Sequence, residues 1–168
     1  KIPTGTNPFE IGTTTNATTG ETRLTEAPTG AGFYAFAGGA MKEIQHLPKV
    51  QTQLQLVTED GRWLYYRAND KKVDSYAIYK YEIATGKKET VFAEDGLWSV
   101  VDHQNDKGNR KLLLSKATGA LTAEFWEWDE AQKKLTPLLG QNEKEEYAVS
   151  YSATPGELVV LTPKFGDF

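Results

Sequence analysis

The sequence predicts an all-β fold in which short antiparallel strands follow one another along the chain. Aromatic residues make up 11% of the 168 residues, and eight residues are tyrosines, a side chain enriched in strands. From Gln53 onward, short apolar-alternating segments are separated by clusters of Gly, Asp, Asn and Lys, the pattern of successive strands and turns. A turn followed by a strand also recurs at a nearly constant spacing, which indicates an internal repeat.

Ten strands are expected in this part of the chain. Alternation is clearest where Tyr79, Tyr81 and Ile83 fall on one face of a strand. Gly86 follows in a hairpin turn, because glycine readily adopts the positive φ that a tight turn needs. The expected strands are 53–57, 63–67, 75–83, 89–92, 98–102, 111–115, 121–128, 135–138, 147–151 and 158–162.

Glycines in the turns mark the repeat. Gly61, Gly108 and Gly156 each precede a strand, at spacings of 47 and then 48 residues, and the turn at 84–88 has its counterpart at 130–134. A repeat of roughly 40–50 residues with four strands is typical of a β-propeller blade, which buries its faces against its neighbours. We therefore expect a partial β-propeller of about three four-stranded antiparallel blades, with a β-sandwich as the alternative. The expected blades are 53–97 and 98–142, followed by an incomplete blade at 143–168.

The first 52 residues fit the repeat less well. Residues 17–25 have a Thr-Gly turn followed by a strand, which we interpret as the end of one blade. This turn lies 66 residues before Gly86 instead of one period, so an insertion is expected. Within 30–50 we expect the first strand of the following blade at 32–36 and an inserted loop.

Three stretches resemble the N-terminal β-propeller of the prolyl oligopeptidase family of serine peptidases. They are 58–66 (TEDGRWLYY), 78–86 (IYKYEIATG) and 146–162 (EYAVSYSATPGELVVLT). The third is the most specific, since the first two patterns are shared with Tol-system and other propellers. The resemblance covers roughly 53–168. It implies that the chain is a fragment of a larger protein in which further blades complete the ring.

The resemblance also implies where catalysis takes place in the parent protein. The family's nucleophilic serine stands in a Gly-x-Ser-x-Gly elbow of a separate α/β-hydrolase domain. No serine of this chain has glycines two residues to either side; the serines are Ser75, Ser99, Ser115, Ser150 and Ser152. We therefore expect no catalytic residue on this chain and a serine peptidase as the parent protein.

Metal and cofactor sites are not expected. The chain has no cysteine, which excludes disulfides and thiolate ligands. Its two histidines are His46 and His103. The polar cluster at 102–106 surrounds His103, but its spacing does not match a calcium loop, and we interpret it as a solvated turn between strands.

An acidic run at Glu143, Glu145 and Glu146 invites a functional interpretation. The dipeptidyl peptidase branch of the family holds a substrate's amino terminus with an acidic pair, which requires converging carboxylates. Lys144 interrupts the run here, and the surrounding residues do not match that motif. A charged loop is therefore the favoured interpretation.

The four tryptophans also have two interpretations. Indole faces pack well on sugar rings, so Trp63, Trp98, Trp126 and Trp128 are candidates for a carbohydrate-stacking platform. Aromatic residues at matched points in a repeat usually fill the space between blades, and we favour that packing role. Substrate-binding residues therefore remain unassigned.

Two classes of function follow. The favoured one is a non-catalytic propeller segment that restricts access to the hydrolase domain of a prolyl-oligopeptidase-family peptidase. The alternative is a stand-alone propeller-like binding or scaffold module of the periplasm or cell surface. Expected partners are the missing hydrolase domain and blades, a peptide substrate, and a second copy that meets exposed blade edges. Periplasmic or secreted residence is expected, with the cytoplasm as the alternative.

Bulk composition excludes other classes. A net charge of −4 argues against binding to nucleic-acid phosphates, which usually requires a basic patch. The sequence has no run of 18 apolar residues and no basic-then-apolar start, so neither a membrane span nor a retained signal peptide is expected.

Overall fold

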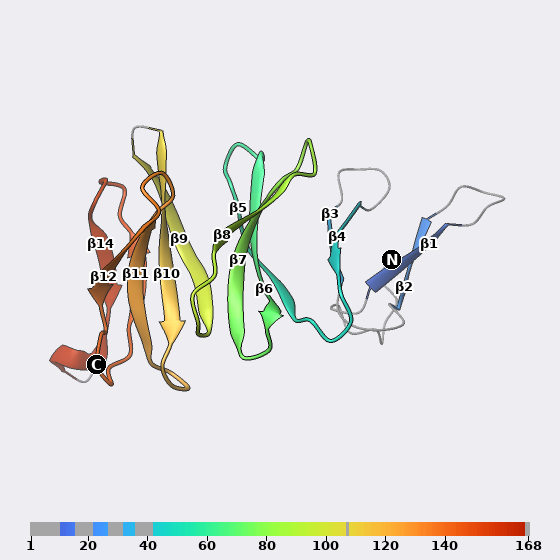
Figure 1. Cartoon of the computed structure of the whole chain (residues 1–168). Helices are drawn as coiled ribbons and strands as arrows, with labels where there is room; N and C mark the ends of the chain where they lie inside the picture. The colour runs from blue at the N-terminus through green and yellow to red at the C-terminus, as the bar shows by residue number, and fades with distance from the viewer. Residues whose placement is uncertain (1–10, 16–21, 27–31, 36–41, 107, 167–168) are drawn as a thin grey trace.

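The computed structural model describes residues 11–15, 22–26, 32–35, 42–106 and 108–166. These residues form fourteen strands and one short 3-10 helix. The strands lie in five antiparallel sheets that follow one another along the chain (Figure 1). Successive sheets of this kind differ from the two stacked layers of a β-sandwich, so that alternative is excluded.

Two of the sheets are complete four-stranded blades, each a meander in which neighbours in sequence pair with each other. Blade A comprises β5 (Thr52–Val57), β6 (Trp63–Lys72), β7 (Ser75–Glu82) and β8 (Lys88–Phe92). Blade B comprises β9 (Trp98–Asp106), β10 (Asn109–Ala117), β11 (Ala123–Asp129) and β12 (Lys134–Leu139).

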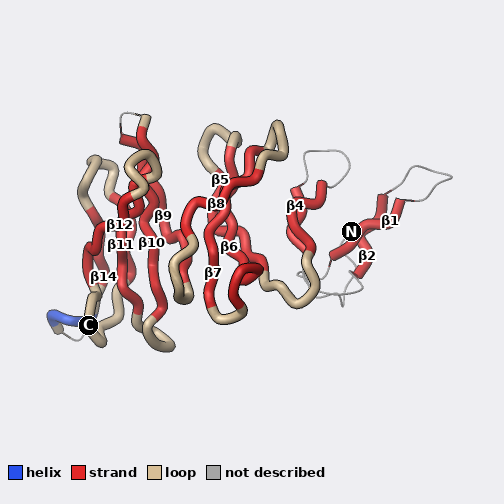
Figure 2. The backbone as a smooth tube through the Cα atoms, in the orientation of Figure 1, coloured by secondary structure: helices blue, strands red, loops and turns tan. Residues whose placement is uncertain are grey.

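Three two-stranded sheets flank the complete blades (Figure 2). On the C-terminal side, half-blade C comprises β13 (Ala148–Tyr151) and β14 (Leu158–Leu161), and the helix η1 (Pro163–Phe165) follows it. On the N-terminal side, β1 (Ile11–Thr15) pairs with β2 (Thr22–Glu26), and β3 (Gly32–Ala35) pairs with β4 (Lys42–His46).

The first strands of consecutive sheets are neighbours in space. Strand β3 contacts β5, β5 contacts β9, and β9 contacts β13. Each sheet therefore packs its face on the next while its later strands extend outward, which is the arrangement of propeller blades. The fold is an all-β partial β-propeller.

The turn glycines recur in the same connection of each sheet. Gly61, Gly108 and Gly156 join the first and second strands of blades A, B and C, with φ of 64°, 87° and 84°. The turns after the third strand also correspond, although one residue away from the expected alignment. Gly86 in blade A has φ of 76°, and its counterpart in blade B is Lys133 with φ of 53°, 47 residues later.

Apolar clusters fill the spaces between the sheets. Ile78 of blade A and Leu112 of blade B are both fully buried in the cluster between these two blades. Tyr66 faces the opposite way, in a cluster that includes Ile44 of β4, and Leu113 packs with Val149 of half-blade C. Full burial of an aliphatic side chain contributes about 1.5–3 kcal/mol, so the contacts between blades hold the fold together.

Polar side chains of the first strands connect each blade to the next. Gln55 lies at a bulge of β5, and its Oε1 accepts a hydrogen bond from the backbone N–H of Val100 at 2.9 Å. One blade later, Asp102 Oδ2 accepts from the N–H of Tyr151 at 2.8 Å. A polar hydrogen bond between neighbouring sheets therefore recurs in the repeat, in addition to the strands themselves.

The ten expected strands are present, with some different bounds. Strand β11 begins at Ala123 instead of residue 121, and Leu121 lies in the preceding turn with 72% of its surface exposed. Within 30–50 the expected strand at 32–36 is present as β3, and the segment also contains a strand that was not expected, β4 at Lys42–His46. The Thr-Gly turn at 19–20 lies outside the described residues.

Candidate functional site: an aromatic pocket between blades A and B

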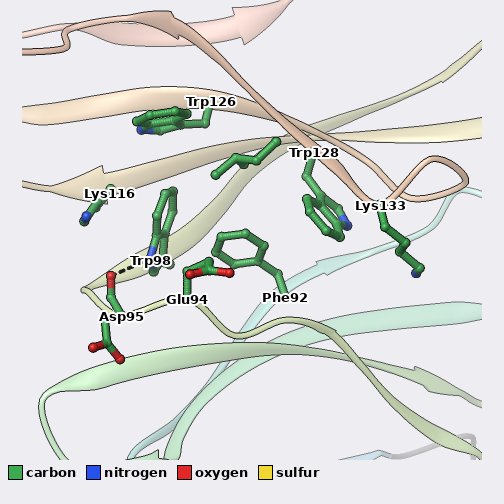
Figure 3. A pocket seen from close by; sticks show the side chains of 9 residues that line it. Phe92, Glu94, Asp95, Trp98, Lys116, Trp126, Trp128 and Lys133 are labelled. Carbon is green, nitrogen blue, oxygen red and sulfur yellow. Dashed lines mark hydrogen bonds between the residues drawn. The ribbon is translucent and has the colours of Figure 1, made fainter.

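A pocket of about 550 Å³ opens between blades A and B. Figure 3 shows its side chains, which come from the end of blade A, the linker between the blades, and one face of blade B. A volume of this size is typical of a small-molecule site. The lining residues are Phe92, Glu94, Asp95, Trp98, Lys116, Trp126, Trp128, Lys133 and Leu135.

Aromatic rings form the wall of the pocket. Trp126 and Trp128 are two residues apart on β11, so they project from the same face of the strand. The Phe92 ring packs edge-on against Trp98 and Trp128, at centroid distances of 4.8 and 5.2 Å. Such contacts are worth about 0.5–1.5 kcal/mol each beyond the area that they bury, so the wall is held in place by its own packing.

The linker between the blades is anchored at Gly96. Its N–H donates to Ser75 Oγ at 3.0 Å, and its carbonyl accepts from the N–H of Tyr76 at 2.9 Å. Gly96 has φ of 130°, and a Cβ there would lie 2.7 Å from Lys116 Cε. The positive φ favours glycine here, and the Lys116 side chain lies against the linker with its ammonium 5.3 Å from the ring centre of Trp98.

Charged groups of both signs surround the aromatic wall. Glu94 and Asp95 come from the linker, while Lys116 and Lys133 come from blade B. Asp95 is already paired with Lys72 at 2.8 Å. Glu94 and Lys133 have no ion-pair or hydrogen-bond partner among the described residues and remain available to a ligand.

Two hydrogen-bond donors in this wall are unsatisfied. The Nε1 atoms of Trp126 and Trp128 are buried and have no acceptor among the described residues. By contrast, Trp98 Nε1 donates to the carbonyl of Asp95 at 3.1 Å. A buried donor without an acceptor costs about 1–3 kcal/mol, so two in one pocket mark a place where an acceptor is missing.

The four tryptophans pack between the blades, as the repeat predicted. Trp98 is 2% exposed within the cluster between blades A and B, and the other three are partly buried against it. Trp63 lies apart from the pocket, with Lys80 Nζ 5.0 Å from its ring centre. The structure therefore brings Trp98, Trp126 and Trp128 into one cavity and leaves Trp63 outside it.

Three of the five serines, and the backbone of His103, take part in structural hydrogen bonds. Ser75 accepts from the linker, Ser99 accepts from Arg67, and Ser152 accepts from the N–H of Thr154 at 2.9 Å in the turn of half-blade C. The backbone N–H of His103 donates to Asp102 Oδ1 at 2.8 Å. Among the described residues no group of three or more His, Cys, Asp or Glu side chains is placed to hold a metal ion.

Glu143 of the acidic run forms specific side-chain contacts. Glu143 accepts hydrogen bonds from Tyr147 and from Lys164 of η1, the latter at 2.8 Å. The hydrogen bond from Lys164, followed by that from Tyr147, lowers the pKa of the Glu143 carboxyl. Glu143 therefore fastens the linker of half-blade C to the end of the chain.

Sequence reasoning identified three of the pocket's tryptophans and missed its other residues. Glu94 and Asp95 stand in a short acidic linker, and Lys116 and Lys133 are two lysines among many. The only available signal was the alternation of Trp126 and Trp128, which places both on one face. Which face meets the linker depends on how the blades pack, and the sequence pattern does not specify it.

Comparisons with known proteins assign no family. No family model matches the chain, and no curated protein matches it. Among solved structures, TolB from Acinetobacter baumannii is similar at a TM-score of 0.45 and 15% identity, over 88% of this chain. The chain spans 44% of that TolB chain. None of the described helices is long and apolar enough to cross a membrane.

Proposed function

We propose that this chain is a non-catalytic propeller segment of a larger serine peptidase of the prolyl oligopeptidase family. The stretches that resemble the family fall on strands and turns of the blades. Residues 58–66 form the first turn and second strand of blade A, and 78–86 its third strand and following turn. Residues 146–162 span half-blade C.

The observation that carries the proposal is an uncovered sheet face on half-blade C. Tyr65 in blade A and Leu113 in blade B are fully buried, each in the cluster formed with the following sheet. In β14, Leu158 packs back on blade B, whereas Val159 and Leu161 on the other face are 51% and 70% exposed. This exposed face is apolar, as are the faces that are buried between the blades, so we expect a further blade to cover it.

In this proposal the chain selects substrates by size and makes no bond itself. A closed ring of blades over a hydrolase domain admits short peptides and excludes folded proteins. The polar connections between blades, such as Gln55 with Val100, would keep the ring from widening. The parent protein is proposed to reside in the periplasm or to be secreted, which cell fractionation would test.

The experiment begins with the full-length gene product. We expect its sequence to continue through further blades into a Gly-x-Ser-x-Gly elbow. The purified protein should react with a fluorophosphonate serine probe and cleave short peptide amides while leaving casein intact. A variant that lacks the whole propeller should retain the probe reaction and lose the size restriction. A gene product that ends after the propeller, or that does not react with the probe, contradicts the proposal.

The pocket favours a second candidate, a binding or scaffold module. Two unsatisfied indole donors beside an unpaired carboxylate and an unpaired ammonium are unusual in a surface that serves packing alone. A propeller that ends without a hydrolase domain and still binds a ligand in this pocket would establish the module. The full-length gene sequence therefore distinguishes the two candidate functions, because only the peptidase requires a hydrolase domain.

A further inference from the structure

The pocket between blades A and B contains both kinds of hydrogen-bonding group beside an apolar wall. Glu94 can only accept hydrogen bonds when ionised, and Lys133 can only donate. The indole N–H groups of Trp126 and Trp128 also only donate, and both lack an acceptor. A matching ligand must therefore offer acceptors and donors together, on a body that is partly apolar.

We propose that this pocket binds a carbohydrate, with one or more sugar rings of a neutral oligosaccharide seated against Trp126 and Trp128. A sugar ring has an apolar C–H face that packs on an indole, and hydroxyls around its edge. Each hydroxyl is both a donor and an acceptor, so it pairs equally well with Glu94 or with Lys133. The pocket's volume of about 550 Å³ lies in the range of ligand sites.

The arrangement of the side chains suits this ligand. In Figure 3 the Phe92 ring lies next to the Trp128 ring, Trp126 lies farther along the same strand, and Glu94 lies beside Phe92. Both indole nitrogens are buried, whereas the rings as a whole are only half-buried, so the sugar is expected to contact the accessible parts of the Trp126 and Trp128 rings. Sugar binding is therefore expected to change the tryptophan fluorescence, which a ligand held only at the charged rim would leave unchanged.

A proline-rich peptide fits the same wall less well. Such peptides dock in aromatic grooves and present carbonyl acceptors, which would pair with Lys133. Their prolines have no N–H, so the Glu94 carboxylate would face carbonyl oxygens without a donor. The proposal goes beyond the proposed peptidase segment and does not depend on catalysis.

The test measures binding to the full-length protein by calorimetry and tryptophan fluorescence. The probes are chitotetraose, cellotetraose and maltotetraose, with a decaproline peptide for comparison. We expect one sugar to bind and Glu94→Gln to weaken it about tenfold. Trp128→Phe, which keeps an aromatic ring beside Phe92 and reduces the ring area open to the sugar, should weaken it similarly in calorimetry.

Matched controls lie outside the pocket. Glu59→Gln changes an exposed carboxylate in the first turn of blade A, and Trp63→Phe changes a tryptophan of the same cluster that does not line the pocket. Both should leave the sugar affinity unchanged. The proposal is overturned if none of the sugars binds at about 10 mM. It is also overturned if only decaproline binds, or if the pocket variants and the controls behave alike.

Discussion

The Tyr65 hydroxyl on blade A donates a hydrogen bond to Glu130 Oε1 on blade B at 2.5 Å. Arg110 donates to the same hydroxyl at 3.1 Å, and Lys80 lies 3.2 Å from Glu130 Oε2. Burial, and then the hydrogen bond to Glu130, raise the pKa of Tyr65, so the hydroxyl keeps its proton at physiological pH. Blades A and B are therefore joined by a polar cluster as well as by their apolar core.

Removal of this hydroxyl should weaken the contact between blades A and B. Tyr65→Phe is expected to lower the free energy of unfolding by about 1–3 kcal/mol, because Glu130 and Arg110 each lose a partner. Urea unfolding measures the change. Tyr76→Phe is the control, since its hydroxyl bonds to Gln51 at an exposed position and should cost less than about 0.5 kcal/mol. Equal effects of the two variants would show that the cluster does not join the blades.

The turn glycines should respond alike to substitution. Gly61→Ala, Gly108→Ala and Gly156→Ala each place a side chain at positive φ, where it meets no atom within 4 Å. Each is expected to cost about 1 kcal/mol in the free energy of unfolding, from backbone strain alone. Gly140→Ala should cost more, because its Cβ would lie 2.5 Å from the carbonyl oxygen of Ala123. Widely unequal costs for the first three would contradict their equivalence.

Acid should destabilise the turn of blade B that contains Asp129. Hydrogen bonds, first from the N–H of Gln132 and also from Asn109, lower the pKa of the Asp129 carboxyl from 3.8. A lowered pKa means that the folded state binds this proton more weakly than the unfolded state. The stabilisation is therefore present above pH 3.8 and is lost as pH falls through the lower, folded-state pKa.

Urea midpoints measured from about pH 7 to about pH 2 test this pH dependence. Asp129→Asn should lower the midpoint at neutral pH and make the fall below about pH 4 shallower. Glu59→Gln, at an exposed turn, should leave both unchanged. If the urea midpoint of Asp129→Asn falls below about pH 4 as steeply as that of the unsubstituted chain, this carboxyl does not contribute to the pH dependence of stability.

The uncovered face of half-blade C should promote association of the 168-residue chain. Leu161→Lys is expected to reduce self-association in sedimentation velocity, because it places a charge on the exposed face of β14. Its effect on the urea midpoint should be small, since Leu161 is 70% exposed. Leu121→Lys, at an exposed turn of blade B, is the control and should not change association. Identical sedimentation of both variants and the parent would exclude this face as the contact.

The strands and turns of blades A and B could be predicted because local chemistry determines them. Gly61 and Gly156 stand where the chain requires positive φ, and the alternation from Tyr79 to Ile83 specifies which residues share a face. Strand β4 was missed because Pro48 and the preceding Gly-rich segment indicate a loop, while its pairing with β3 is tertiary. The one-residue error at Lys133 arose because lysine gives no sign of positive φ.

The pocket could be predicted only in part. Alternation places Trp126 and Trp128 together, but the space beside them depends on how Phe92 and Trp98 pack on these two rings. Phe92 and Trp98 are distant in sequence from β11. Sequence periodicity carries no information about such a gap.

The face of each blade that packs on the next blade in sequence is buried only by that next blade. During synthesis, each blade therefore exposes this apolar face for a time. Tyr65 and Leu113 have no cover until the ribosome has produced the following sheet. At 5–20 residues per second, a repeat of this length takes roughly 2–10 s to translate, far longer than hydrophobic collapse. A newly synthesised blade therefore exposes its apolar face for several seconds, and chaperones can bind the blade during this time.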